Sequence, residues 1–151
     1  MDDIDRKILV HLQLNGRDSY ADIGKSVGLS VSAVNDRLKK LIATGAIQRF
    51  AALVDPAAVG CRLLAFVSVL LERPEHDKPF LAAIADLADV QECHHVTGDW
   101  SYLLKIRVAD TAALERVISD KIKTLPGVAR SQTVIALSSA KDDPAIACLP
   151  E

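Results

Sequence analysis

The side chains best suited to chemistry lie on a predicted helix that begins after Ser30 and runs to about Ala43. Its apolar residues Val34, Leu38 and Leu41 share a narrow arc at about 100° per residue. The other side and its flanks carry Ser32, Asn35, Asp36, Arg37, Lys39 and Lys40. Short polar side chains allow close approach to base edges, and lysine and arginine reach guanines or phosphates. This pattern suits a helix in the DNA major groove, but it fits equally a three-helix domain with a solvated charged face.

A second candidate is the turn at Gly98-Asp99, between strands predicted over 90–97 and 102–108. A glycine-containing turn exposes backbone N–H groups that can hold a carboxylate, and a nearby acid can hold an ammonium group. Glycine and aspartate are also common in plain β-turns, so the spacing leaves both interpretations open. The neighbouring Trp100 is the only tryptophan, and we expect it to pack at a subunit interface.

The remaining reactive side chains predict no catalytic or metal centre. Adjacent His94 and His95 should point to opposite faces of a strand, so they cannot share one metal. The three cysteines form no CxxC pair, which argues against a zinc ribbon or a disulfide framework. No general acid/base pair or oriented nucleophile is recognisable. We therefore expect a protein without enzymatic activity, metal or cofactor, and its isolated thiols suit a reducing cytoplasm.

Composition places the chain among ordinary globular proteins. Of its 151 residues, 50% are hydrophobic and 25% are charged. No uncharged apolar run approaches the roughly 18 residues of a membrane span, and the acidic N-terminus has no signal core, so we expect a cytoplasmic protein. Residues 1–50 hold eight basic side chains against six acidic ones, whereas the rest of the chain is net acidic. This asymmetry weakly indicates that the first part meets an anion.

Two further helices precede the polar one. The first has an apolar face from Ile4 to Leu12 and a cap at Asp2 or Asp3, and the second starts after Ser19 and ends at Gly28. A short turn then leads to the third helix, as in a helix-turn-helix. Residues 47–54 are predicted to be extended. We therefore place a DNA-binding domain at 1–45, a strand linker at 46–60 and a second domain at 61–151.

The second domain is predicted to follow the order strand, helix, strand, strand, helix, strand. The expected segments are 63–72, 79–87, 90–97, 102–108, a helix capped by Thr111, and 128–137. This βαββαβ order is that of a ferredoxin-like α+β domain with helices on one face of the sheet. The strands are apolar on both faces, so we expect a second copy to cover the open face in a homodimer.

The motifs and their order resemble the Lrp/AsnC family of feast/famine regulators over nearly the whole chain. The matching stretches are Ile4-Asp5-Arg6-Lys7-Ile8-Leu9, Asn15-Gly16-Arg17, Val27-Gly28-Leu29-Ser30, Arg37-Leu38-Lys39-Lys40-Leu41, Gly45-Ala46-Ile47, Gly98-Asp99-Trp100-Ser101-Tyr102-Leu103-Leu104 and Leu125-Pro126-Gly127-Val128. The resemblance implies a winged helix-turn-helix joined by a strand linker to a ferredoxin-like sensing domain. It further implies a transcription regulator that binds double-stranded DNA, responds to an amino acid, and forms homodimers that often assemble into octamers.

The resemblance also assigns residues to two sites. In the DNA site, Ser32, Asn35, Asp36 and Lys39 are expected at base edges, Arg37 and Lys40 nearer phosphates, and Ser30 as a phosphate donor. Asp36 could accept a hydrogen bond from a cytosine amino group, but we expect it to pair with Arg37 or Lys40. The effector site is expected to comprise Gly98, Asp99, Trp100, Ser101, Tyr102, Leu103, His95, Ser131 and Thr133, with a neighbouring subunit's 130–133 segment approaching the turn.

One position departs from the family pattern. Ser101 stands where a second acid is usual, so the charged partner that the family offers to the ammonium group is missing, and the effector could be another amino acid, a different small molecule or absent. This leaves an effector-independent architectural DNA-binding protein as an alternative. A regulator-like enzyme resembling sirohaem decarboxylases is the less favoured alternative, because residues 17–45 retain a complete helix-turn-helix.

Overall fold

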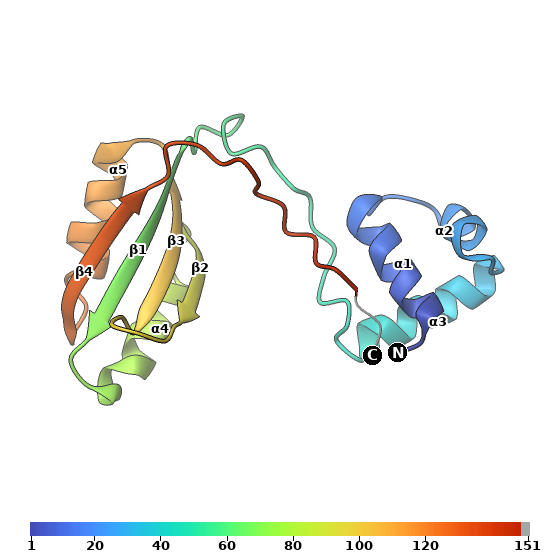
Figure 1. Ribbon diagram of the computed structural model, residues 1–151, viewed down its shortest axis with the longest axis horizontal. Coiled ribbons are helices and arrows are strands. Elements are labelled where there is room, and N and C mark those ends of the chain that lie inside the picture. The colour runs from blue at the N-terminus through green and yellow to red at the C-terminus, as the bar shows by residue number, and fades with distance from the viewer. Residues whose placement is uncertain (149–151) are drawn as a thin grey trace. The chain divides into compact units, whose positions relative to one another are not determined.

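The computed structural model describes residues 1–148 and divides into two compact units (Figure 1). Among the described residues, the helical unit comprises 1–53 and 141–148, and the sheet unit comprises 54–140. Among the described residues, no helix combines the length and apolar character that a membrane span requires.

The helical unit contains the three predicted helices. They are α1 (Asp3–Leu14), α2 (Tyr20–Val27) and α3 (Val31–Ala43). One buried residue of α1, one of α2 and three of α3 form its core: Ile8, Ile23, Val34, Leu38 and Leu41. The apolar arc predicted on the third helix is therefore the face by which α3 packs on α1 and α2.

The predicted helix starts are confirmed by their capping geometry. The side chains of Asp2, Ser19 and Ser30 each accept a hydrogen bond from the backbone N–H three residues later, at 2.8, 3.2 and 3.3 Å. These bonds satisfy donors that a helix N-terminus otherwise leaves open. At the end of α2, Gly28 adopts φ 73°, the left-handed conformation expected of a glycine after a helix.

The strand expected over residues 47–54 is absent. The described helical unit contains helices only, so the fold has no strand-based wing within one chain. An isolated extended segment cannot form a ladder, since every strand needs a second segment to receive its hydrogen bonds. Ile47 packs against the core of the helical unit, whereas Phe50, Leu53 and Val54 are exposed.

The sheet unit has the predicted βαββαβ order. Its elements are β1 (Leu63–Leu71), α4 (Asp77–Ala85), β2 (Val90–His95), β3 (Tyr102–Val108), α5 (Thr111–Arg116) with its π-helical continuation (Val117–Ile122), and β4 (Val128–Ile135). The strands form one antiparallel sheet in the order β2-β3-β1-β4, and both helices lie on the same face (Figure 1). This confirms the ferredoxin-like expectation.

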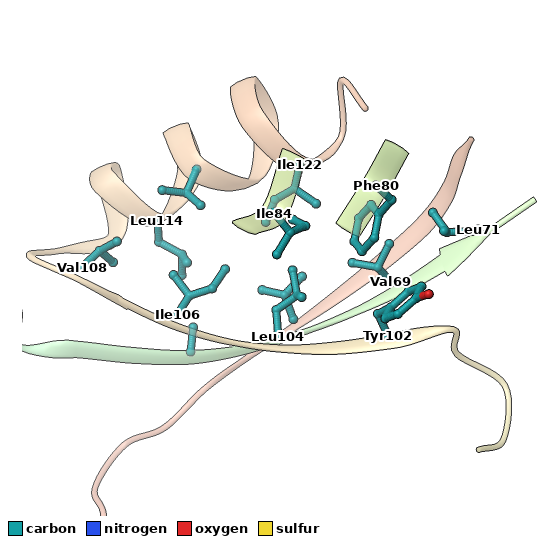
Figure 2. Packing of buried hydrophobic residues seen from close by; sticks show 13 residues of the cluster. Val69, Leu71, Phe80, Ile84, Tyr102, Leu104, Ile106, Val108, Leu114 and Ile122 are labelled. Atoms are coloured by element: carbon teal, nitrogen blue, oxygen red, sulfur yellow. The ribbon is translucent and has the colours of Figure 1, made fainter. Parts of the chain in front are cut away.

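The core of this unit lies between the sheet and its two helices. Alternate residues of the strands, such as Val69, Leu104 and Ile106, meet Phe80 of α4 and Leu114 of α5 (Figure 2). The strictly alternating burial of β3 follows from the period of two in a strand. It places Tyr102 on the helix-covered face and Leu103 on the open face.

Several predicted boundaries shift by one or two residues. The first sheet-unit helix spans 77–85 rather than 79–87, and three strands end earlier than expected, at 71, 95 and 135. The cap of α5 is Asp110, not Thr111, because the Asp110 carboxylate accepts the Ala113 N–H at 2.8 Å. An aspartate immediately before a helix is as good a cap as threonine, which explains the one-residue error.

The second sheet face carries no helix of this unit (Figure 2). Cross-strand partners share a face, so Phe66 of β1 lies there with Val134 of β4 and Lys105 of β3. Val134 is 55% exposed, and Lys105 is held by Glu92 at 3.1 Å. The face is thus mixed in character, with an apolar part along β1 and β4.

Candidate nucleic-acid interface and effector turn

The outward side of α3 gathers most of the residues predicted to meet DNA. Ser32, Asp36, Lys39 and Lys40 are exposed, and Asn35 is half-buried on one flank. Ser30 is committed to capping α3, and its hydroxyl also lies 3.1 Å from that of Ser32. The arrangement presents short polar side chains towards the start of the helix and two ammonium groups further along it.

The α2–α3 turn depends on Gly24, a residue that the sequence analysis did not single out. The Leu29 N–H donates to the Gly24 carbonyl at 2.9 Å, and a Cβ at position 24 would lie 2.5 Å from the Leu29 carbonyl oxygen. No Cβ fits that space, so glycine sets how closely the turn approaches α2. A glycine inside a predicted helix was the available signal, because it costs stability unless packing requires it.

Arg37 has a different environment from the one predicted. Its Nη1 lies 2.7 Å from Asp2 Oδ2 and 2.7 Å from Asp5 Oδ1, so the guanidinium ties α3 to the start of α1. The Asp5 side chain is 6% exposed. The Asp5 N–H and then the Arg37 guanidinium hold the pKa of Asp2 below its ordinary value. Arg37 therefore links two helices of the unit, and its predicted approach to phosphate stays a prediction.

The expected pairing of Asp36 is also wrong. Arg37 is turned towards α1, and neither Asp36 nor Lys40 takes part in an ion pair among residues 1–148. At about 100° per residue, neighbouring side chains of a helix point away from each other, which separates Asp36 from Arg37. The Asp36 carboxylate is therefore exposed beside Ser32 and Lys39 on the outward side.

The turn predicted to hold the effector is anchored through Ser101. Its N–H donates to the Val69 carbonyl at 2.9 Å, and its hydroxyl oxygen accepts the Leu71 N–H at 3.1 Å. Its carbonyl accepts the Val96 N–H at 3.1 Å, and Gly98 adopts φ 101° between these anchors. The serine that replaces the usual acid therefore extends the hydrogen bonding of β1, where the β1–β4 register shifts.

Tyr102 belongs to the core and not to an open ligand surface. It is 3% exposed, its hydroxyl donates to Asp77 Oδ1 at 3.1 Å, and its ring lies 5.1 Å from that of Phe80. His95 stacks on the same ring at 5.1 Å. Burial, and then the Asp77 carboxylate, raise the pKa of Tyr102 above its ordinary value.

The residues predicted for the effector site lie on two different faces of the sheet. Tyr102 and its partner His95 point to the helix-covered face, as do Ser131 and Thr133, which pair with Val69 and Val67. Leu103 points to the open face opposite Ser68. The structure thus brings together the turn residues 98–101, places four of the five strand residues on the helix-covered face and separates Leu103 from them.

Trp100 packs on an arginine of its own chain. The Arg130 guanidinium carbon lies 4.6 Å from the centroid of the Trp100 ring, within cation–π range. The family resemblance implied that the 130–133 segment of a neighbouring subunit approaches this turn. In the structure β4 lies beside β1, whose end is bonded to the turn, so Arg130 reaches Trp100 within one chain.

Two domain families match the two units in order. Residues 1–42 match the AsnC-type helix-turn-helix domain, and residues 64–146 match the Lrp/AsnC ligand binding domain. The leucine-responsive regulatory protein of Salmonella typhimurium is 39% identical over 143 residues, which cover 93% of this chain and 87% of that protein. The Escherichia coli K12 protein of the same name is 38% identical over the same length and coverage.

Solved structures of transcriptional regulators also resemble this chain over nearly its whole length. A Neisseria meningitidis transcriptional regulator in complex with L-methionine has a TM-score of 0.92 at 31% identity, covering 97% of this chain and 96% of that one. The feast or famine regulatory protein of M. tuberculosis complexed with L-methionine has a TM-score of 0.89 at 34% identity, covering 97% and 98%. E. coli AsnC has a TM-score of 0.87 at 28% identity, covering 94% and 95%.

Proposed function

This chain belongs to the Lrp/AsnC family of transcriptional regulators, and from that premise we propose how it reads DNA and what it senses. It has a helix-turn-helix DNA-binding domain and a ligand-binding domain. We propose that it acts in the cytoplasm as a sequence-specific regulator without catalytic activity. We further propose that an amino acid bound at the subunit interfaces of the ligand-binding domain modulates its affinity for DNA.

The outward side of α3 is the proposed reading surface. Ser32 and Asn35 are short enough to reach base edges in the major groove, and an asparagine amide can bond an adenine through two contacts. Lys39 and Lys40 are exposed cations suited to a guanine edge and a phosphate. Asp36 can accept from a cytosine amino group. Arg37 is left out of this surface because Asp2 and Asp5 hold its guanidinium.

The observation that carries the proposal is the close α2–α3 packing at Gly24. It fixes the angle at which α3 stands out from the unit, while the polar residues of α3 remain exposed. This close packing fits a helix-turn-helix, in which the second helix enters the major groove while the first crosses the backbone. Each helical unit offers few base contacts. We therefore propose that a homodimer, assembling further into an octamer, supplies the DNA affinity through several linked helical units, the DNA-binding heads of the assembly.

The open sheet face is the proposed dimer surface. Phe66 and Val134 lie beside each other there, and a second copy would cover both by the same patch on each protomer. Effector binding between subunits would then change the assembly or the spacing of the heads, and thereby the arrays of sites that the protein can hold.

The proposed effector is an amino acid, by analogy with the L-methionine complexes of the Neisseria and M. tuberculosis regulators. The Gly98–Ser101 turn is the proposed site, because its exposed backbone N–H groups suit a carboxylate. An effector-independent architectural DNA-binding protein is the second candidate. The observation that favours it is Ser101, whose hydroxyl already accepts a hydrogen bond from Leu71 where the family usually has an acid.

One experiment separates the two candidates. Light-scattering mass and DNA affinity are measured for the full chain with each of the twenty amino acids, L-methionine first. A mass above the dimer and a DNA affinity that one or a few amino acids shift support the sensing regulator. Gly98→Trp should abolish the response, since it fills the turn and forces φ 101° on a bulky residue. Constant values across the panel support the architectural alternative.

A further inference from the structure

We propose that Arg130, resting on Trp100, binds the carboxylate of the ligand at the Gly98–Ser101 turn, and that this carboxylate dominates recognition. The ligand class is a small monocarboxylate with an apolar side chain, either an amino acid or the corresponding 2-oxo acid. The inference rests on the proposed sensing function and adds the group that provides most of the affinity.

Arg130 has the features of an anion-binding residue without its anion. It is exposed within the single chain, on the open sheet face opposite Leu70 and four residues along β4 from Val134, and its guanidinium carbon lies 4.6 Å from the centre of the Trp100 ring. Within residues 1–148 it has no carboxylate partner, unlike Arg37, which is held by Asp2 and Asp5. An arginine that stacks on an aromatic face keeps its N–H edge available, and that edge matches a carboxylate in two-point geometry.

The neighbouring turn supplies further donors. The backbone N–H groups of Gly98, Asp99 and Trp100 donate to no acceptor in the described part of the chain. Ser101 fixes them in place through its bonds to Val69 and Leu71. Consecutive free N–H groups in a turn with positive φ form a concavity that favours anions, and a turn already held in place loses little entropy on binding.

The charges of the turn favour the carboxylate end of a ligand over its ammonium end. Asp99 is the only acid among residues 98–101, and the Ser101 hydroxyl oxygen is already an acceptor for Leu71. Against these stand a full guanidinium charge and three N–H dipoles. The indole of Trp100 and the half-buried Leu70, which pairs with Arg130, offer apolar surface for the rest of the ligand.

The test uses the single tryptophan as a reporter at the site. Fluorescence of the full chain is titrated with L-methionine, 4-(methylthio)butanoate, 4-methylthio-2-oxobutanoate and 3-(methylthio)propylamine, and calorimetry provides a readout independent of the indole. We expect the Kd of 4-(methylthio)butanoate, which lacks the amino group, to lie within about threefold of the lower of the Kd values of L-methionine and its 2-oxo acid. The Kd of 3-(methylthio)propylamine should be at least about tenfold higher, since this amine has no carboxylate to accept the charged hydrogen bonds. The comparison of methionine with its oxo acid identifies which source the site prefers.

A matched pair of variants assigns the effect to Arg130. Arg130→Gln keeps a hydrogen-bonding side chain but removes the charge, and should weaken carboxylate binding about tenfold or more. Arg116→Gln removes an exposed arginine of α5 and should leave binding unchanged. An amine that binds as tightly as the acid, or an Arg130→Gln variant with wild-type affinity, overturns the inference.

The outcome also distinguishes this inference from the proposed function. If L-methionine or another amino acid shifts DNA affinity equally in wild type and Arg130→Gln, the sensing function stands and the role of Arg130 is refuted. If none of the four probes binds by calorimetry and no amino acid changes DNA affinity, both fail together.

Discussion

Replacing Arg37 by methionine should destabilise the helical unit without removing a phosphate contact. In the structure one guanidinium nitrogen lies 2.7 Å from a carboxylate oxygen of Asp2 and 2.7 Å from one of Asp5. Methionine keeps much of the length and the apolar stem but removes the charge. The variant therefore leaves the Asp5 carboxylate, 6% exposed, without its cation.

The magnitude follows from the burial of the two partners. Removing one member of a fully buried ion pair costs about 3–5 kcal/mol, because the remaining charge is buried and uncompensated. Arg37 is 28% exposed, and Asp5 keeps a hydrogen bond from the Asp2 N–H at 3.1 Å. The exposed contact with Asp2 adds little. We therefore expect the free energy of unfolding of the helical unit to fall by about 2–3 kcal/mol.

Urea denaturation followed by far-UV circular dichroism measures the loss, with Lys40→Met as the matched control. Lys40 is exposed and unpaired among residues 1–148, so the free energy of unfolding of Lys40→Met should differ from that of the wild type by less than about 0.5 kcal/mol. DNA affinity at several salt concentrations supplies the second readout. Lys40→Met should reduce the salt slope by about one, whereas Arg37→Met should keep it. Wild-type stability together with a reduced slope in Arg37→Met would refute the reasoning.

Three further predictions concern single positions. Gly24→Ala should lower the free energy of unfolding by about 1–2 kcal/mol and DNA affinity at least about tenfold, since the new Cβ would lie 2.5 Å from the Leu29 carbonyl oxygen. Gly16→Ala is the control in the same assays, because its Cβ would lie at an ordinary 3.4 Å from the nearest backbone oxygen. Equal behaviour of the two variants would count against the tight turn. Because the pKa of Asp2 is lowered in the folded state, the ionised carboxylate contributes its full stabilisation above about pH 4 and loses it as the pH falls through the folded-state pKa. Acid should therefore unfold the helical unit at a lower pH in the wild type than in Asp2→Asn. Coincident acid-unfolding profiles would contradict this. Tyr102→Phe should cost the sheet unit about 1 kcal/mol through loss of its hydroxyl's bond, measured by Trp100 fluorescence in urea, and an unchanged midpoint would show that this bond contributes nothing.

The elements that depend on local chemistry could be predicted from the sequence. The helix starts after Asp2, Ser19 and Ser30 follow from side chains that accept hydrogen bonds from N–H groups three residues later. The end of α2 follows from Gly28, because glycine adopts the left-handed φ of 73° without steric cost. The βαββαβ order follows from alternating periods of hydrophobicity. These signals span a few residues, so they survive without knowledge of the tertiary structure.

The long-range contacts could not be predicted. Arg37 pairs with carboxylates more than 30 positions earlier, and nothing in its own helix distinguishes it from Lys40. Likewise, the stacking of Arg130 on Trp100 depends on which strand lies beside β1. Such contacts are fixed by how elements pack, and periodicity within one element carries no information about them.

The effector residues show an intermediate case. Residues 98–101 lie in the predicted turn between β2 and β3, because a glycine between two strands is a local signal, while their role in effector binding stays a prediction. Tyr102 and Leu103 face opposite sides of the sheet, as simple alternation requires. The faces of Ser131 and Thr133, by contrast, depend on the register of β4, which shifts at Leu70 and Leu71. One residue of slip would reverse them, so no sequence pattern decides that part of the site.

Selection of bound sequences from a randomised DNA duplex pool tests the central claim most directly, namely that α3 reads base sequence. The full-length chain is compared with the Asn35→Ala and Ser32→Ala variants, with Arg116→Gln as a surface control. We expect the wild type and the control to enrich one defined motif with two-fold symmetry, and the α3 variants to lose or change preference at particular base positions. Enrichment of no motif, or an identical motif from all four proteins, would contradict the account.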